Sequence, residues 1–385
     1  MPSLRDVIAR RIRARGPLPF AEYMDLALYH QSLGYYARID RRSGRSGDFF
    51  TSVDVGTLFG ELLAAQFAEM WQCLQGKSDL GADEHDLVEA AAGSGRLALD
   101  VLDATARTHP DLYDTIRLTL VDRSPAARAS HVNTLGPHAS KLRDSTETVL
   151  PAHIKGIVFA NELLDALPSH PIVMTDSGLA EVYVDLSPRD QDRFVECLVS
   201  PSAAVLAHVD RFGIELEPGW RAEVCPDAVS WVEQAGRSLD GGFLVLIDYG
   251  HPASELYSAT HAAGTLTTYH RHVVGTSGDH ATPAWLRDPG AVDITAHVDL
   301  TAVRRAAEDV GLDTLAIVDQ TYFLLGIGAT DWPEPNDPVK ALRRRLALKT
   351  LLIPGGLGSS HKVMIFGKNV GTPELLGCSF SRRST

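Results

Sequence analysis

The stretch that decides the fold is Asp86-Leu-Val-Glu-Ala-Ala-Ala-Gly-Ser-Gly-Arg96. A short apolar segment, 86–90, leads into Gly93 and Gly95, and a helical pattern follows over 97–107. Glycine lets the backbone pass close to a bound ligand at a strand-to-helix turn. The stretch therefore predicts a strand, a ligand-binding turn and a helix, although an ordinary connection between strand and helix would look similar.

The alternation of strands and helices continues along the chain. Further strands are predicted at 117–121, 156–160, 242–247, 314–318 and 362–366, and helices at 126–135 and 298–310. Such alternation produces a mostly parallel sheet covered on both faces, which binds ligands at the carboxyl ends of its strands. The polar residues of this chain gather at those ends: Glu89, Asp122, Asn161, Glu162, Asp248 and Tyr249.

Two cofactors suit the glycine turn. Gly93-x-Gly95-x-x-Ala98 fits the dinucleotide fingerprint, which makes an NAD-dependent oxidoreductase the alternative. Glu89, just before the glycines, disfavours a pyrophosphate and favours the cationic methionine end of S-adenosylmethionine. Asp122 can accept hydrogen bonds from the ribose of either cofactor, so it predicts a nucleoside ligand without choosing between them.

A second candidate site follows the strand at 156–160. Glu162 and Asp165 could hold a cationic acceptor or take its proton. If a helix begins near Glu162, the two carboxylates share one face of it. The structural alternative is that Asn161 caps this helix and Glu162 favours its N-terminus. Asp293-Ile-Thr-Ala-His297-Val-Asp299 is likewise expected to open a helix, either capping it or reaching the site.

The patterns divide the chain into four expected segments. An N-terminal helical cap occupies 1–78, with helices at 20–29 and 55–74. The remaining segments are the first half of the core at 79–170, an inserted substrate-binding region at 171–240, and the second half at 241–385 with a loop insertion at 250–295. Within the substrate-binding region, strands are expected at 179–186 and 194–199 and a helix at 220–238.

Composition limits the partners. The 385 residues include 36 Lys and Arg against 49 Asp and Glu, a net charge of −13, so a nucleic acid is disfavoured and a protein partner is expected. Four scattered cysteines form no C-x-x-C pair. No apolar run reaches the ~18 residues of a membrane span and no signal peptide is evident, which predicts a soluble cytoplasmic protein. No metal is expected, because no common zinc spacing matches His251, His270, His272, His280 and His297.

With these motifs in view, the chain resembles the MidA-like methyltransferase family, which includes a mitochondrial complex I assembly factor. The resemblance covers most of the chain and rests on Gly16-Pro-Leu-Pro-Phe-Ala-Glu-Tyr-Met24, Gly34-Tyr-Tyr36, Gly47-Asp-Phe-Phe-Thr-Ser52, Leu58-Phe-Gly60, Gly93-Ser-Gly95-Arg96, Ala160-Asn-Glu-Leu-Leu-Asp165, Ile247-Asp-Tyr-Gly250 and Asp293-Ile-Thr-Ala-His297. It implies a class I S-adenosylmethionine-dependent methyltransferase, an α/β protein whose Rossmann-like doubly wound sheet carries an N-terminal helical cap and a β-containing insertion.

The resemblance also implies functional residues. Those expected to bind the cofactor are Asp48, Phe49, Thr51, Glu89, Gly93, Gly95, Asp122 and Asn161. Because the mitochondrial relative is similar to a protein arginine methyltransferase, Glu162 and Asp165 are expected to hold a guanidinium. Tyr249 and His297 complete the catalytic candidates. A non-catalytic assembly factor is a further alternative for the function. A homodimer is one candidate for the oligomeric state.

Three residues depart from the family pattern. Ala91 stands where the first glycine is usual, Asp122 where glutamate is commoner, and Gln31 where proline is usual. Ala91 narrows the freedom of the backbone at the cofactor turn. This departure bears on the affinity for the cofactor.

Overall fold

The computed structural model describes residues 2–37, 52–75, 84–191, 193–270, 273–275, 282–332, 336–353 and 357–381. The chain folds into two compact units. The first, here called the sheet unit, comprises Phe50–Leu163, Val232–Tyr249 and Ala306–Thr385. The second, the insert unit, comprises Met1–Phe49, Leu164–Trp231 and Gly250–Arg305. The expected cap at 1–78 is therefore divided between the two units.

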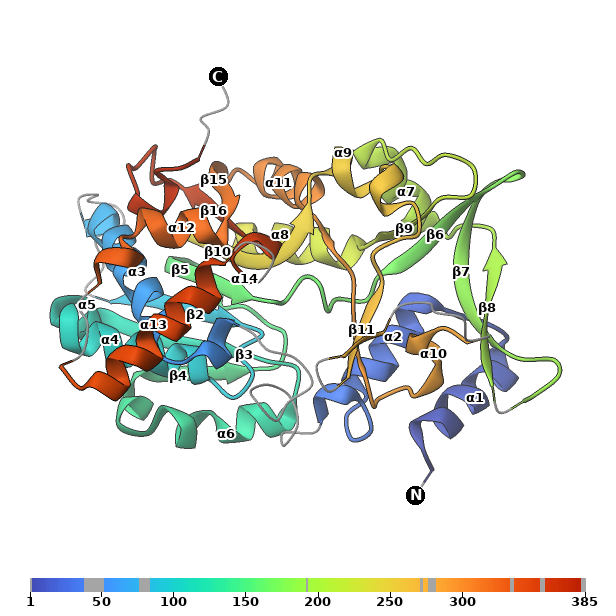
Figure 1. Cartoon of the computed structure of the whole chain (residues 1–385), viewed down its shortest axis with the longest axis horizontal. Coiled ribbons are helices and arrows are strands. Elements are labelled where there is room, and N and C mark those ends of the chain that lie inside the picture. Colours follow the sequence, from blue (N-terminus) through green and yellow to red (C-terminus); the bar gives the residue numbers. More distant parts are fainter. Residues whose placement is uncertain are drawn as a thin grey trace. The chain divides into compact units, whose positions relative to one another are not determined.

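The sheet unit is built on seven hydrogen-bonded strands (Figure 1). They are β2 (His85–Ala90), β3 (Ile116–Val121), β4 (Leu142–Thr146), β5 (Ile154–Asn161), β10 (Leu239–His251), β15 (Asp313–Asp319) and β16 (His361–Lys368). Their order across the sheet is β4-β3-β2-β5-β10-β16-β15, and β16 runs antiparallel to both of its neighbours. The predicted parallel core is confirmed; β4 had no predicted counterpart.

The direction of winding reverses between β2 and β5. From β2 the chain steps outward through α4 (Arg96–Thr108) to β3 and through α6 (Pro125–Leu135) to β4. From β5 it steps the other way, through α8 (Pro226–Ser238) to β10 and through α11 (Leu300–Asp309) to β15. Because parallel crossovers are right-handed, this reversal puts the two sets of helices on opposite faces of the sheet. The sheet is therefore doubly wound, as predicted.

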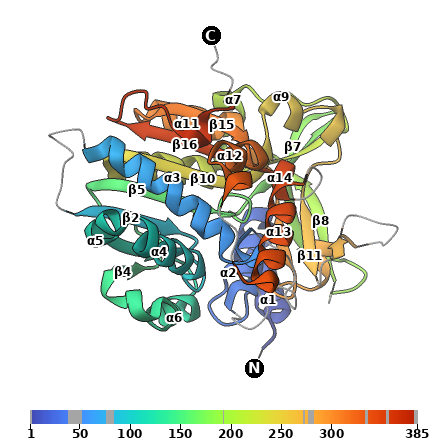
Figure 2. The ribbon, with the colours of Figure 1, turned by 60° about the vertical axis from the view of Figure 1, so that its left-hand side comes forward.

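One face of this sheet is packed by α3 (Leu58–Gln75), which lies beside α4 and β5 (Figure 2). Phe67 of α3 meets Phe159 of β5 with ring centroids 5.1 Å apart. Burying such a side chain stabilises the fold by roughly 1.5–3 kcal/mol. Gly60 allows the close helix crossing, because a Cβ there would lie 2.5 Å from the Cβ of Asp100. The remaining helices of this unit are α5 (Pro110–Thr115), α12 (Gln320–Gly326), α13 (Pro338–Leu352) and α14 (Leu357–Ser360).

The insert unit combines short helices with two small antiparallel sheets. One sheet has the order β1-β7-β6-β9, with β8 beside β7, and the other the order β12-β11-β13. The strands of these two sheets are β1 (Leu18–Pro19), β6 (His170–Thr175), β7 (Gly178–Leu186), β8 (Phe194–Val199), β9 (Arg221–Val224), β11 (Thr267–His270), β12 (Val273–Gly275) and β13 (Asp293–Thr295). A further strand, β14 (Val298–Asp299), pairs parallel with the last two residues of β10. The helices of the insert unit are α1 (Leu4–Arg15), α2 (Phe20–Tyr29), α7 (Ala203–Phe212), α9 (Ala253–Leu256) and α10 (Ala284–Arg287).

A buried aromatic group fixes α2 in the insert unit. Phe20, Tyr23 and Phe194 are each at most 1% exposed, and the rings of Tyr23 and Phe194 meet edge to face at 5.9 Å. The hydroxyl of Tyr23 donates to the carbonyl of Trp285 at 2.7 Å, so this buried polar atom is satisfied. The predicted helix at 20–29 is confirmed.

Two predicted helix starts can be compared with the structure, and the first of them is wrong. The helix expected at 220–238 begins only at Pro226, because 221–224 form β9 and pair with β6 instead. Asp293-Ile-Thr-Ala-His297-Val-Asp299 leads into the helix α11, which starts at Leu300, although its first three residues form β13. Asp299 caps that helix by accepting from the backbone N–H groups of residues 301 and 302.

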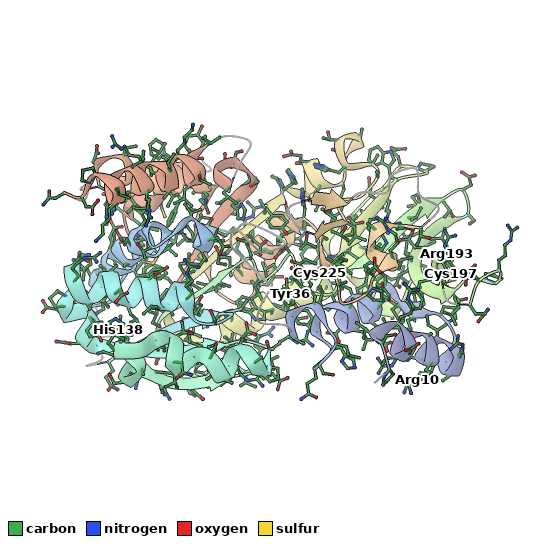
Figure 3. The ribbon with its side chains drawn as sticks, turned by 60° about the horizontal axis from the view of Figure 1, so that its bottom comes forward. Arg10, Tyr36, His138, Arg193, Cys197 and Cys225 are labelled. Atoms are coloured by element: carbon green, nitrogen blue, oxygen red, sulfur yellow. The ribbon has the colours of Figure 1, made fainter. Side chains whose placement is uncertain are left out.

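The four cysteines are free thiols, and two of them, Cys197 and Cys225, lie well apart in Figure 3. This agrees with their scattered spacing in the sequence. Within the described part of the chain, no helix combines the length and apolar character needed to cross a bilayer.

Candidate functional site

The polar ends of the parallel strands line up along one edge of the sheet. The register pairs Ala90 of β2 with Val121 of β3 and with Ala160 of β5, and it pairs Asn161 with Ile247 of β10. The winding reverses between β2 and β5, and in doubly wound sheets ligands usually bind in the crevice outside this edge at such a reversal. The structure thus brings together Glu89, the glycine turn, Asp122, Asn161, Glu162 and Tyr249, as predicted from the sequence.

The turn between β2 and α4 has an unusual backbone. Ala91, Gly93 and Gly95 have φ angles of +56°, +54° and +84°. Alanine in this left-handed region costs roughly 1–2 kcal/mol, so the backbone is strained at Ala91. A Cβ at Gly93 would meet no atom within 4 Å, whereas one at Gly95 would lie 3.0 Å from Leu120 Cδ1. Gly93 therefore borders open space, and Gly95 serves packing.

Asp122 holds this turn in place. One carboxylate oxygen accepts from the backbone N–H of Gly93 at 2.8 Å, and the other accepts from the N–H of Ser124 at 2.7 Å. A carboxylate has about four acceptor positions, so Asp122 can still accept from ribose hydroxyls while anchoring the loop. Its role as a loop anchor was not foreseen from the sequence.

His131 is a second anchor that the sequence did not reveal. It is fully buried on α6, with Nε2 2.9 Å from the carbonyl oxygen of Gly93 and Nδ1 2.8 Å from the Ser145 hydroxyl. The carbonyl only accepts, so Nε2 carries the hydrogen and Nδ1 accepts from Ser145. Burial lowers the pKa of His131, which keeps the ring neutral and this arrangement fixed. A lone histidine in a helical pattern carries no signal for such a role.

Glu89 is a buried carboxylate beside the turn. It is 3% exposed, and one oxygen accepts from the backbone N–H of Ala98 in the first turn of α4 at 3.1 Å. Burial raises its pKa well above the usual value, and Asp122 and Asp100 raise it further. A cationic ligand group would stabilise the ionised form, so this position suits the methionine end of S-adenosylmethionine better than a pyrophosphate.

The ends of β5, β10 and the start of β16 form a polar cluster. The Asn161 amide donates to Glu162 Oε1 at 3.1 Å, and His361 Nε2 lies 3.4 Å from the same oxygen. His361 pairs with Tyr249 in the sheet register, and their rings meet edge to face at 5.5 Å. Asn161 Oδ1 is buried without a hydrogen bond among the described residues. It is therefore an acceptor available to a ligand. His361 was not predicted, because its segment gives only the signal of a strand at 362–366.

The helix expected to begin near Glu162 does not form. Glu162 has a φ of +53°, and its N–H donates to the carbonyl of Ile247 in β10 at 2.8 Å, which turns the chain away from β5. Residues 162–169 then form bends and turns. Glu162 and Asp165 therefore do not share a helix face. Asp165 belongs to the insert unit, where it is 5% exposed.

Three expected cofactor residues, Asp48, Phe49 and Thr51, lie outside the described residues. The next residue, Ser52, is fully buried in the sheet unit, and its hydroxyl donates to Gln320 Oε1 at 3.0 Å. The end of the Gly47–Ser52 motif is thereby fixed in the unit that carries the glycine turn.

The remaining catalytic candidate, His297, lies in the insert unit. It borders a small pocket, partly open to solvent, which Asp165, Glu223 and Asp299 also line. Burial, together with the neighbouring imidazoles of His251 and His261, lowers the pKa of His297 to about 4. In the same unit, the hydroxyl of Tyr36 (labelled in Figure 3) donates to Asp293 at 3.0 Å, which joins two of the quoted sequence motifs.

Residues 62–318 match a family model described as "Putative S-adenosyl-L-methionine-dependent methyltransferase". The chain belongs to this family. The fold and the turn chemistry agree, so the protein is a class I methyltransferase, and its cofactor is S-adenosylmethionine. These findings favour methyl transfer over the oxidoreductase and the non-catalytic assembly factor.

Individual relatives of this methyltransferase agree. It is 30% identical over 352 residues to the human mitochondrial protein arginine methyltransferase NDUFAF7, covering 85% of this chain and 73% of the relative. The rat protein of the same name is 29% identical, covering 85% and 74%. A solved COG1565 superfamily member from Burkholderia thailandensis, with S-adenosyl-homocysteine bound, matches with a TM-score of 0.86 and 29% identity over 99% of this chain and 95% of that one.

One expectation about this methyltransferase must be corrected. A cytoplasmic location was predicted from its composition and the character of its first residues. The curated relatives are mitochondrial proteins, which contradicts that prediction. Overall composition does not reveal the compartment of a protein, because receptors recognise short targeting segments and not the bulk of the chain.

Proposed function

We propose that this methyltransferase transfers a methyl group to an arginine side chain of a protein, with Glu162 as the residue that holds the guanidinium. The supporting observation is the place of Glu162, a partly buried carboxylate at the crevice edge of β5, next to the available acceptor Asn161 Oδ1. The curated relatives are named protein arginine methyltransferases.

We assign the cofactor to the glycine turn and its neighbours. Gly93 offers open space beside a left-handed backbone, Glu89 offers a buried carboxylate for a cationic group, and Asp122 offers acceptors for ribose. Asn161 Oδ1 is the fourth polar contact, and Gly95 keeps the turn close to the core. Asp48, Phe49 and Thr51 stay predicted contacts. These features fit an adenosyl group that ends in a cationic amino acid.

Bound S-adenosylmethionine supplies a methyl group on a positively charged sulfur. Glu162 can accept two hydrogen bonds from the planar guanidinium and thereby orient one of its nitrogens for in-line attack. As the new N–C bond forms and the C–S bond breaks, the electron pair returns to sulfur and the nitrogen loses one proton. Glu162 is placed to take that proton and pass it to solvent. Tyr249 contributes by packing on His361, which lies beside the carboxylate.

Asp165 and His297 are the two remaining catalytic candidates. Both belong to the insert unit, and both line the pocket described above. Their catalytic roles stay predictions. Asp165→Asn and His297→Gln, each followed by a measurement of turnover, would test them.

The test is turnover on an arginine-containing protein identified by transfer of a labelled methyl group. Glu162→Gln keeps the shape of the side chain but removes its charge. We expect turnover to fall at least about tenfold, or 1.4 kcal/mol in transition-state stabilisation, with cofactor affinity within twofold of the parent. Glu147→Gln, the same change at an exposed residue of the sheet unit, is the matched control. Full turnover in Glu162→Gln, or labelling on lysine alone, would refute the proposal.

A further inference from the structure

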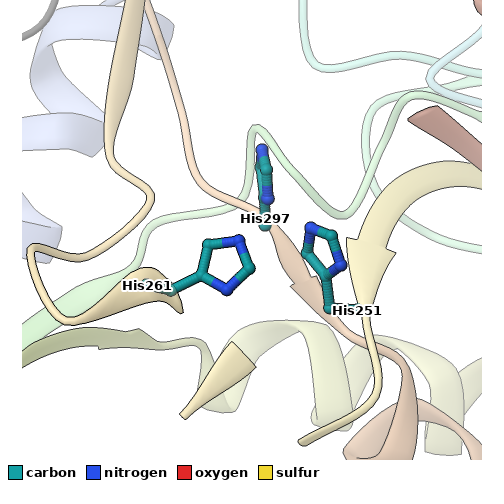
Figure 4. A group of neighbouring side chains, drawn as sticks. All are labelled: His251, His261 and His297. Carbon is teal, nitrogen blue, oxygen red and sulfur yellow. The ribbon is translucent and has the colours of Figure 1, made fainter. Parts of the chain in front are cut away.

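Three histidines that are distant in the sequence meet in the insert unit (Figure 4). His251 ends β10, His261 ends the 3₁₀ turn 259–261, and His297 immediately precedes β14. The pairing of β10 with β14 sets His251 opposite Asp299 and so fixes two of these segments side by side. The imidazole centroid of His251 lies 4.6 Å from that of His261 and 5.1 Å from that of His297.

Glu255 on α9 sets the orientation of two of these rings. Its carboxylate lies 3.0 Å from Nδ1 of His251, and its backbone carbonyl lies 3.0 Å from Nδ1 of His261. Both groups accept hydrogen bonds, so both Nδ1 atoms carry the hydrogen and each ring presents the Nε2 lone pair. In protein metal sites, ligating histidines are held in the same way, with the second ring nitrogen donating to a carboxylate or a carbonyl.

We propose that His251, His261 and His297 form a three-histidine site for a divalent transition metal, with Zn²⁺ as the resident ion. One ring nitrogen of each residue lies within 4.8 Å of one ring nitrogen of the other two. Tetrahedral zinc with Zn–N bonds of about 2.0–2.1 Å needs ligand nitrogens roughly 3.4 Å apart. The rings therefore have to close by at most about 1.4 Å, which small side-chain rotations supply.

The donor set selects the class of metal. Imidazole nitrogens suit Zn²⁺, Ni²⁺ and Cu²⁺, whereas Mg²⁺ and Ca²⁺ prefer oxygen ligands. Three protein ligands leave a fourth position for water, and Glu255 is the supporting residue behind two of them. The ion would link the segment 251–261, which contains α9, to His297 just before β14.

The sequence argued against a metal because the spacing of the histidines matched no common motif. The histidines considered for that motif did not include His261, the residue that completes the cluster. His272 and His280, which were included, lie outside the described residues. The proposed site is thus assembled by tertiary structure from three separate segments.

The experiment measures Zn²⁺ binding to the tag-free full chain after treatment with a chelator. Competition against a chromophoric chelator should give one tightly bound equivalent, and Co²⁺ should give the visible absorption of a low-coordinate nitrogen site. Histidine-to-alanine substitution at 251, 261 or 297 should each weaken binding at least about 100-fold, and Glu255→Ala roughly 10- to 100-fold. The melting temperature of the parent, but not of these variants, should rise when Zn²⁺ is added.

The matched control is His153→Asn, which removes an exposed histidine paired with Asp240. The φ of His153 is +59°, and asparagine tolerates that conformation. The control should keep the single equivalent at parental affinity. His261→Gln, a milder change in a surface turn, keeps the test decisive if an alanine variant fails to fold. Equal affinity in the parent and in folded variants of all three histidines, or no binding beyond weak surface association in the parent, would overturn the proposal.

Discussion

Replacing Glu89 with glutamine separates cofactor recognition from folding. The amide keeps an oxygen that can accept from the backbone N–H of Ala98, now 3.1 Å from the carboxylate, but it carries no charge. Because burial raises the pKa of Glu89, the folded state retains this proton over a pH range in which the unfolded chain has lost it. The free energy of unfolding therefore falls as pH rises from about 4.5 through the raised pKa. At neutral pH the buried, ionised carboxylate destabilises the folded state.

Glu89→Gln is thus expected to change stability and cofactor affinity in opposite directions. Without cofactor at pH 7, Glu89→Gln should melt at the same or a higher temperature than the parent, because the cost of burying the charge is removed. Affinity for S-adenosylhomocysteine should fall, because a hydrogen bond to a charged group contributes about 1.5–3 kcal/mol. That loss corresponds to a dissociation constant roughly 10- to 150-fold higher.

The assay is calorimetric titration with two ligands. S-adenosylhomocysteine carries the amino-acid end, whereas 5′-methylthioadenosine has the same nucleoside without it. Only the first should lose affinity in Glu89→Gln. An equal loss for both ligands would mean that Glu89 shapes the loop and does not recognise the amino group. Unchanged affinity for both would remove Glu89 from the cofactor site.

The other predictions concern the turn and one buried histidine. Gly93→Ala should lower the free energy of unfolding by about 1–2 kcal/mol and the affinity for S-adenosylhomocysteine at least tenfold. Gly95→Ala should destabilise the fold more, because its Cβ would lie 3.0 Å from Leu120 Cδ1. A lower melting temperature for Gly93→Ala than for Gly95→Ala would contradict this. Ala91→Gly should raise the free energy of unfolding by up to about 1 kcal/mol in urea titrations, because the relief of backbone strain exceeds the added entropy of the unfolded chain. A lower free energy of unfolding would show that the turn is unstrained. Burial lowers the pKa of His208 to about 4, so between pH 7 and 5 the unfolded chain takes up a proton that the folded chain does not. The free energy of unfolding of the parent should therefore fall by about 2 kcal/mol over this range, and that of His208→Gln should fall less. Equal losses in both proteins would show that His208 is not the cause.

The glycine turn shows how far local sequence reaches. Strand, turn and helix are local features, and parallel strands must end at one edge of a sheet, so the order of residues alone is enough to place Glu89, Asp122 and Asn161 together. The same reasoning failed after Asn161. The positive φ of Glu162 and its hydrogen bond to Ile247 arise from a neighbouring strand about 85 residues later in the chain, which no local pattern contains.

The sequence by itself therefore determined the class of fold, the cofactor turn and the family, because hydrophobic periodicity and glycine positions are written in consecutive residues. Tertiary structure alone decided which side chains support the site. His131 reaches Gly93 from another helix, His361 reaches Glu162 from the last strand, and His261 joins two histidines from other segments. Each of these contacts depends on where the chain returns in space, and that is set by the packing of the whole sheet and its insertions, not by the spacing of residues along the chain.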